Sequence, residues 1–115
     1  MATSTIEKVT NDSGTNSNGN YCKMPDGTLI QWGANENLQS GNAIMFPMRF
    51  FNNNYIVSIT SRYNTASTLR CTYGVTGSNK YTDAFYVYVW DTETGGISTQ
   101  NNIAVEWIAI GRWKS

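Results

Sequence analysis

The side chains that most often perform catalysis are scarce in this sequence. Histidine is absent, which removes the usual general base, a common zinc ligand and the serine–histidine catalytic unit together. Asp91 and Glu93 are the one acidic pair close enough in sequence to suggest the two carboxyl groups of a glycoside hydrolase. Because they lie in a turn with no substrate cleft predicted around them, an ordinary turn is the simpler explanation. We therefore expect a protein that is not an enzyme.

Metal and thiol chemistry have equally few candidates. Asp83, Asp91 and Glu93 carry oxygen atoms of the kind that calcium binds, but their spacing matches no known calcium loop, and we expect no metal or cofactor. Cys22 and Cys71 leave two alternatives open. A disulfide would close a loop of about 50 residues and add roughly 4 kcal/mol in the chain-entropy model, whereas in a protein assembled in the cytosol both are small reduced core side chains.

Composition limits the partners of the chain. The 115 residues suit one domain, and eight acidic residues balance eight basic ones. A net charge of zero without charge runs argues against nucleic acid and against a polybasic membrane contact. No apolar stretch approaches the length of a membrane span, and the first residues lack the pattern of a signal peptide. Charged residues make up 14% of the chain, which predicts a polar surface with few charges.

Apolar residues alternate with polar ones along most of the chain, which is typical of half-buried β-strands. Pro25, Asp26 and Gly27 supply turn chemistry between the first two strands and predict a β-hairpin. Pro47 cannot donate to a sheet and should end the third strand. We expect an all-β, antiparallel sandwich of six to seven short strands, formed by residues 21–24, 28–33, 42–46, 55–62, 67–73, 84–90 and 101–110.

The amino-terminal part has a different character. Residues 10–20 read TNDSGTNSNGN and contain no apolar side chain, so they predict a linker. Ile6 and Val9 before it have helical spacing over a single turn. We therefore divide the chain into residues 1–19, a polar linker with a short preceding element, and residues 20–115, the sandwich.

Five segments in a fixed order resemble a known family. They are KMPDGTLIQWG at 23–33, FP at 46–47 with Phe50 three residues later, YIVSIT at 55–60, FYV at 85–87 and WIAIG at 107–111. Together they resemble the C-terminal receptor-binding domain of phage tail fibre proteins, which has an H-type lectin-like fold, over roughly residues 20–115. The resemblance implies a homotrimer at the distal tip of a virion's tail fibre that contacts a host cell-surface glycan. Residues 1–19 would then be the end of the fibre shaft.

The loops of that family vary, so the resemblance assigns no ligand residue and candidates must come from residue type. Sugar sites combine an aromatic ring for the apolar face of the sugar with amide, acidic or basic groups for its hydroxyls, and they lie at loops. The residues near strand ends that meet these requirements are Arg62, Tyr63, Asn64, Asp83, Trp90 and Asp91.

The strand AFYVYVW at 84–90 has two apolar faces, because side chains alternate across a strand. Tyr86, Tyr88 and Trp90 share one face and carry on the order of 500 Å², as much as the largest apolar patch of an ordinary monomer. We expect Tyr86 and Tyr88 to contact protein, either another subunit or the rest of the same chain. Trp90, at the strand end, is the sugar candidate of the three.

The last strand adds further candidates for a trimer interface, namely Glu106 and Ile108, with Trp113 as a plug near the end of the chain. Glu106 would need a basic partner if neighbouring subunits cover it, because an unpaired buried charge costs several kcal/mol. Arg49, Arg70 and Arg112 are the candidates. The alternative function is a structural trimerisation cap of the fibre without a ligand of its own.

Overall fold

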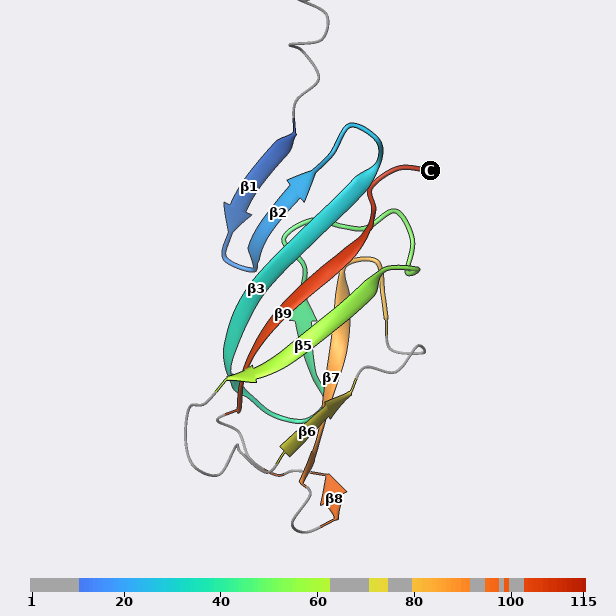
Figure 1. Cartoon of the computed structure of the whole chain (residues 1–115). Helices are drawn as coiled ribbons and strands as arrows, with labels where there is room; N and C mark the ends of the chain where they lie inside the picture. Colours follow the sequence, from blue (N-terminus) through green and yellow to red (C-terminus); the bar gives the residue numbers. More distant parts are fainter. Residues whose placement is uncertain (1–10, 63–70, 75–79, 92–94, 98, 100–102) are drawn as a thin grey trace, which may run out of the picture.

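The computed structural model of the chain describes residues 11–62, 71–74, 80–91, 95–97, 99 and 103–115, and these residues are all-β. None of them forms a helix that could cross a membrane. The strands form two antiparallel sheets, which lie one behind the other in Figure 1. The predicted antiparallel sandwich is confirmed.

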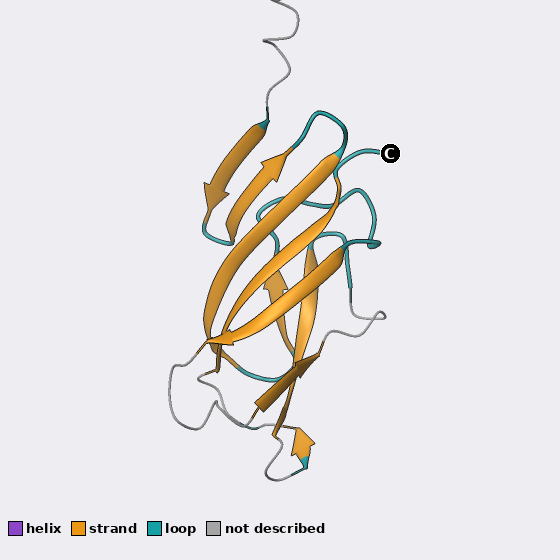
Figure 2. Ribbon diagram, viewed as in Figure 1, coloured by secondary structure: helices purple, strands orange, loops and turns teal. Residues whose placement is uncertain are grey.

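The larger sheet has five strands, and Figure 2 shows how long its central members are. Its order is β1 (Asp12–Asn16), β2 (Gly19–Lys23), β3 (Thr28–Leu38), β9 (Ile103–Arg112) and β5 (Ile56–Arg62). The second sheet has the order β4 (Asn42–Met45), β7 (Ala84–Asp91) and β6 (Cys71–Gly74), with the short β8 (Gly96–Ile97) also paired to β7.

The β2–β3 hairpin forms at the predicted turn. The Met24 amide donates to the Thr28 carbonyl over 2.8 Å, and the Gly27 amide donates to Met24 over 3.1 Å. Gly27 has a φ of +102°, which a side chain would oppose. The Asp26 carboxylate accepts the Thr28 amide at 2.9 Å, and this backbone hydrogen bond is the main reason that its pKa is lowered.

Part of the predicted linker is wrong, because residues 12–16 form β1 and pair antiparallel with β2 along its whole length. The strand escaped the sequence analysis because it buries no apolar side chain. Backbone hydrogen bonds hold it instead, and a polar edge strand of this kind also protects a sheet from pairing with other chains. The two-residue β8 was not predicted either.

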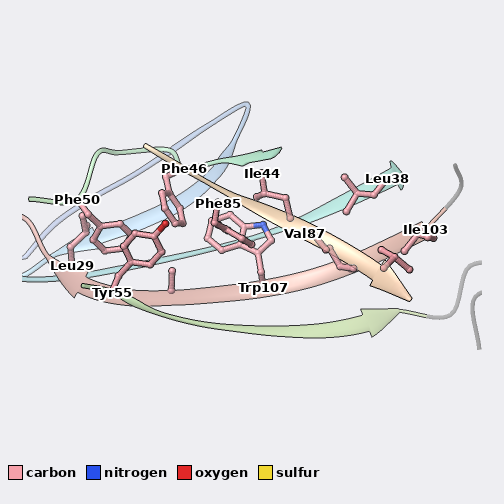
Figure 3. Close-up of a cluster of buried hydrophobic side chains, with 13 residues drawn as sticks. Leu29, Leu38, Ile44, Phe46, Phe50, Tyr55, Phe85, Val87, Ile103 and Trp107 are labelled. Atoms are coloured by element: carbon pink, nitrogen blue, oxygen red, sulfur yellow. The ribbon is translucent and has the colours of Figure 1, made fainter. Parts of the chain in front are cut away.

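An aromatic cluster occupies the space between the sheets (Figure 3). Phe46 lies at its centre, with ring centroids 4.8 Å from Phe50, 5.0 Å from Tyr55, 5.3 Å from Phe85 and 5.6 Å from Trp107. The rings of Phe50, Tyr55 and Trp107 meet Phe46 edge to face, and such pairs stabilise a core beyond the area they bury. The cluster joins the loop after β4 to both sheets and so determines how they pack.

Cys22 lies on β2 in the larger sheet and is a free cysteine. Cys71 opens β6 in the other sheet. Of the two alternatives left open by the sequence, a disulfide or two reduced thiols, the structure shows a reduced thiol at Cys22.

Candidate functional site

The motif LIQWG on β3 presents two different faces. Leu29 and Gln31 are buried, whereas Ile30 is partly exposed and 40% of Trp32 is exposed. Gly33 lies under the Trp107 indole, where an added Cβ would come within 2.9 Å of a ring carbon. The motif therefore builds the core with one face and leaves apolar side chains on the other.

Gln31 is a buried polar residue that the sequence analysis did not single out. Its amide donates to the Met48 carbonyl at 2.7 Å, and its side-chain oxygen accepts the Met48 amide at 2.8 Å. Both hydrogen-bonding groups of the Gln31 amide are thus used within the core. This pair fixes the segment that follows Pro47 against β3.

WIAIG on β9 repeats the pattern of LIQWG. Trp107 and Ala109 are buried, while Ile108 and Ile110 are 42% and 46% exposed. Gly111 leaves room for Phe50 and Tyr55, because an added Cβ there would approach both within 3 Å. The outward residues of the two motifs meet across the sheet, since Ile30 pairs with Ile110 and Trp32 with Ile108.

These side chains form a continuous surface on the five-stranded sheet, which we name the apolar outer face. Ile56 of β5 extends it, because it pairs with Ile110 on the other side of β9 and is 74% exposed. Contiguous exposed apolar patches of this kind mark interaction surfaces rather than ordinary solvent-facing sheet. The apolar outer face consists of Ile30, Trp32, Ile56, Ile108 and Ile110.

Glu106 lies at the polar end of the apolar outer face. It pairs with Thr60 and is exposed, and with Ser58, Thr60 and Ile108 it lines a depression of about 270 Å³. No basic side chain of the described residues is within ion-pair distance of it. The Arg112 guanidinium instead donates to the backbone carbonyls of Asp26 and Lys114, and Arg70 lies outside the described residues. The expected ion pair therefore remains a prediction for an assembled state.

A second hollow lies at the end of the sandwich that carries the C-terminus. It measures about 540 Å³ and lies between the loop before β5 and the segment before β7. Two exposed aromatic side chains contribute to it, Phe51 at 55% and Tyr81 at 50%. We name it the Tyr81 pocket, and its walls are formed by Arg49, Phe51, Asn52, Asn53, Lys80, Tyr81, Thr82 and Asp83.

Hydrogen bonds hold the two walls of the Tyr81 pocket to each other and to the rest of the domain. The Phe50 amide donates to the Thr82 carbonyl at 2.8 Å, and the Phe51 amide donates to Arg112 at 2.7 Å. The Tyr55 hydroxyl donates a hydrogen bond shared between the Tyr81 carbonyl at 2.8 Å and the Ala84 carbonyl at 3.0 Å. Burial raises the pKa of this hydroxyl to about 12, so it stays a donor at neutral pH.

Comparison with known proteins gives the chain a family. The matching family model is described as tail fiber protein gp53-like, C-terminal, and it covers residues 23–112. This range includes the LIQWG and WIAIG motifs. The chain belongs to this family. No curated protein matches the sequence.

Two solved structures share the fold of this tail fibre domain. One is a P. aeruginosa R2 pyocin fibre comprising C-terminal residues of that protein, with a TM-score of 0.62 and 18% identity, over 96% of this chain and 28% of the other. The second is an N-truncated R2-type pyocin tail fibre, with a TM-score of 0.54 and 18% identity, over 96% and 41% of the two chains. The tail fibre domain thus spans less than half of either structure, and at this identity the likeness concerns the fold.

The predicted sugar residues do not form one group in the tail fibre domain. Trp90 and Asp91 lie at the end of β7, and Arg62 ends β5. Asp83 precedes the start of β7, and the eight residues of this strand separate it from Asp91 by roughly 25 Å. Asp83 and Trp90 therefore lie near opposite ends of β7, and the sugar-binding role of each stays a prediction. Tyr63, Asn64 and Glu93 lie outside the described residues.

The predicted interface residues also divide between surfaces. Tyr86 and Tyr88 are partly buried on the outer face of the second sheet, where the Tyr86 ring lies 5.9 Å from that of Tyr81. Glu106 and Ile108 lie on the five-stranded sheet, on the opposite side of the molecule. Trp113 donates to the Met24 carbonyl at 2.7 Å, so within one chain it already closes the end of the β2–β3 hairpin.

Sequence reasoning missed the Tyr81 pocket as a unit. Its residues come from RFFNN at 49–53 and KYTD at 80–83, and of these only Asp83 is a sugar candidate in the sequence analysis. An aromatic residue beside several polar ones was the signal in each. Nothing local indicated that the two segments lie side by side.

Proposed function

We propose that this tail fibre domain is the receptor-binding tip of a fibre on a phage or phage-like particle. In this proposal it acts without enzymatic activity or a cofactor, as a homotrimer that binds host cell-surface carbohydrate. The observation that carries the proposal is the apolar outer face, which one chain leaves exposed. A second and third copy of the chain are its proposed occupants.

The size of the apolar outer face supports a subunit contact. The exposed parts of Ile56, Ile108 and Ile110 amount to about one and a half whole isoleucine side chains, worth roughly 2–5 kcal/mol per subunit if buried. Trp32, which is 40% exposed, adds aromatic area to the same surface. Tail fibre components are generally trimeric, and an outward apolar sheet on each chain suits packing around a three-fold axis.

Carbohydrate recognition is supported by the composition of the remaining surface. Only 14% of the residues are charged and the net charge is zero, which suits oriented hydrogen bonds and ring stacking rather than strong electrostatic attraction. Three weak sites on one tip, multiplied by several tips on a particle, raise the overall affinity without tight single contacts.

The test is adsorption of the fluorescently labelled, assembled protein to host cells. We expect saturable adsorption that soluble surface polysaccharide competes away and that periodate oxidation of cell-surface sugars abolishes. Adsorption that survives periodate but is lost after protease treatment would refute the carbohydrate ligand. A trimer that does not adsorb would favour the trimerisation cap, and release of reducing sugar from the polysaccharide would refute the non-enzymatic function.

A further inference from the structure

We propose that the Tyr81 pocket is a saccharide-binding site of this domain and that it takes a neutral pyranose. This rests on the proposed function for the class of ligand, and it places recognition at the end of β7 opposite Trp90.

The exposure of two aromatic rings at one hollow is the first argument. Phe50 and Tyr55 are each 1% exposed, whereas their neighbour Phe51 and the facing Tyr81 are half exposed. Both exposed rings belong to the lining of the pocket. An aromatic face on the wall of a pocket can stack on the apolar side of a pyranose ring, which removes apolar surface of both partners from water.

Polar groups that have no partner in one chain are the second argument. Across the described part of the chain, the side chains of Arg49 and Asp83 form no hydrogen bond or ion pair. The Asn52 side-chain oxygen accepts the Asn54 amide at 3.0 Å, which leaves its NH₂ group as a donor. The pocket therefore combines a basic fork, an amide donor and a carboxylate acceptor, the set that hydroxyl groups require.

The rigidity of the pocket is the third argument. The Asn53 side chain donates to the Lys80 carbonyl at 3.3 Å, and the Tyr81 amide donates to Ala84 at 2.8 Å. Together with the hydrogen bonds of Phe50, Phe51 and Tyr55, these contacts tie both walls to the core. A site that is already ordered loses little conformational entropy when a small ligand binds.

The charges of the pocket indicate a neutral sugar. The Lys80 ammonium group donates to the Tyr55 carbonyl at 2.6 Å and lies 4.9 Å from the centre of the Tyr55 ring, so the protein already holds this cation in place. Among the described residues of the pocket, the charged side chains without a protein partner are Arg49 and Asp83, one of each sign. The Asp83 carboxylate accepts hydrogen bonds from hydroxyl groups but repels the carboxylate of an acidic sugar.

A binding experiment with the assembled full chain tests the proposal. Methyl glycosides of neutral hexoses, 6-deoxyhexoses and N-acetylhexosamines are screened by ligand-observed NMR, with glucuronic and N-acetylneuraminic acid as acidic probes. The dissociation constant of the best binder is then measured for Tyr81→Ala and Asp83→Asn. Trp90→Ala represents the rival end of β7, and Ile97→Ala is the control because Ile97 is 54% exposed.

We expect a neutral glycoside to bind, and Tyr81→Ala and Asp83→Asn each to weaken binding about tenfold or more, because each removes a stacking or charge-assisted contact. Trp90→Ala and Ile97→Ala should stay within about twofold of the unmodified chain. Asp83→Asn keeps the shape of the side chain, so it decides the matter if Tyr81→Ala impairs folding.

The outcomes separate this proposal from the proposed function. If a saccharide binds and both pocket variants bind it as well as the unmodified chain, the pocket assignment is wrong while carbohydrate recognition stands. Loss of binding in Trp90→Ala alone would place the site at the other end of β7. If no sugar binds and adsorption survives periodate, carbohydrate recognition fails and the pocket assignment fails with it.

Discussion

Substitution of Ile108 by aspartate should dissociate the assembled protein. Ile108 lies in the apolar outer face between Trp32 and Ser58. If a neighbouring subunit covers it, burial of its 42% exposed surface contributes roughly 1 kcal/mol per chain. The larger effect is the new carboxylate, because an unpaired charge at a buried position costs several kcal/mol.

Because a trimer contains three copies of the substitution, the total cost to assembly is on the order of 10 kcal/mol, which lowers the association constant by about seven orders of magnitude. Glu106 on the same face adds like-charge repulsion. Within a single chain Ile108 faces solvent, so the fold of the monomer should be unaffected. The expected result is a folded monomer.

The assay is size-exclusion chromatography with light scattering from nanomolar to high micromolar protein, where each chain adds 12.8 kDa. Met45→Asp is the matched control, because Met45 is 46% exposed but lies on the second sheet. A trimer that persists in Ile108→Asp, or one that dissociates in Met45→Asp instead, would refute the assignment of the interface. If the unmodified chain is monomeric at micromolar concentration, both the homotrimer and the alternative function as a trimerisation cap are refuted.

Three further predictions concern the inner face. Gln31→Leu should lower the free energy of unfolding by roughly 2–4 kcal/mol, measured by urea titration, because the Met48 amide and carbonyl lose their buried partners; an unchanged value would mean that water replaces the amide. Gly33→Ala should cost roughly 1–3 kcal/mol in the same assay through contact with the Trp107 indole, and an unaffected variant would show that the ring can move. The pKa of about 12 at Tyr55 exceeds the ordinary value near 10. The contribution of the protonated hydroxyl to the free energy of unfolding is therefore complete below pH 10 and is lost as the pH rises towards 12. Tyr55→Phe should therefore lose stability less steeply than the unmodified chain over that interval, and parallel curves would contradict the assignment.

Several local features follow from the residues alone. The hairpin at residues 24–28 follows from Pro25, Asp26 and Gly27, because each is suited to a turn position by its own backbone preference or side chain. The alternation within the strands follows in the same way from the two-residue period of the β-conformation. These features need no knowledge of the rest of the chain, and the structure agrees with them.

Other features had no local signal. Strand β1 is polar throughout, and backbone pairing with β2 is what orders it. The Tyr81 pocket joins residues 49–53 to residues 80–83, and the contact exists because Phe50 and Tyr55 both anchor in the core beside the segment before β7. The separation of Asp83 from Trp90 likewise depends on the length and direction of β7.

The sequence by itself determined that the β7 and β9 strands each have two apolar faces, since alternation is a property of the strand. Only the tertiary structure decided which face is the core, because that depends on which strands lie opposite. Phe85 and Trp107 meet between the sheets with ring centroids 5.8 Å apart, and Gly33 and Gly111 leave the room that the inner face needs. Ile108 and Ile110 therefore face outward, where one chain alone has nothing to cover them.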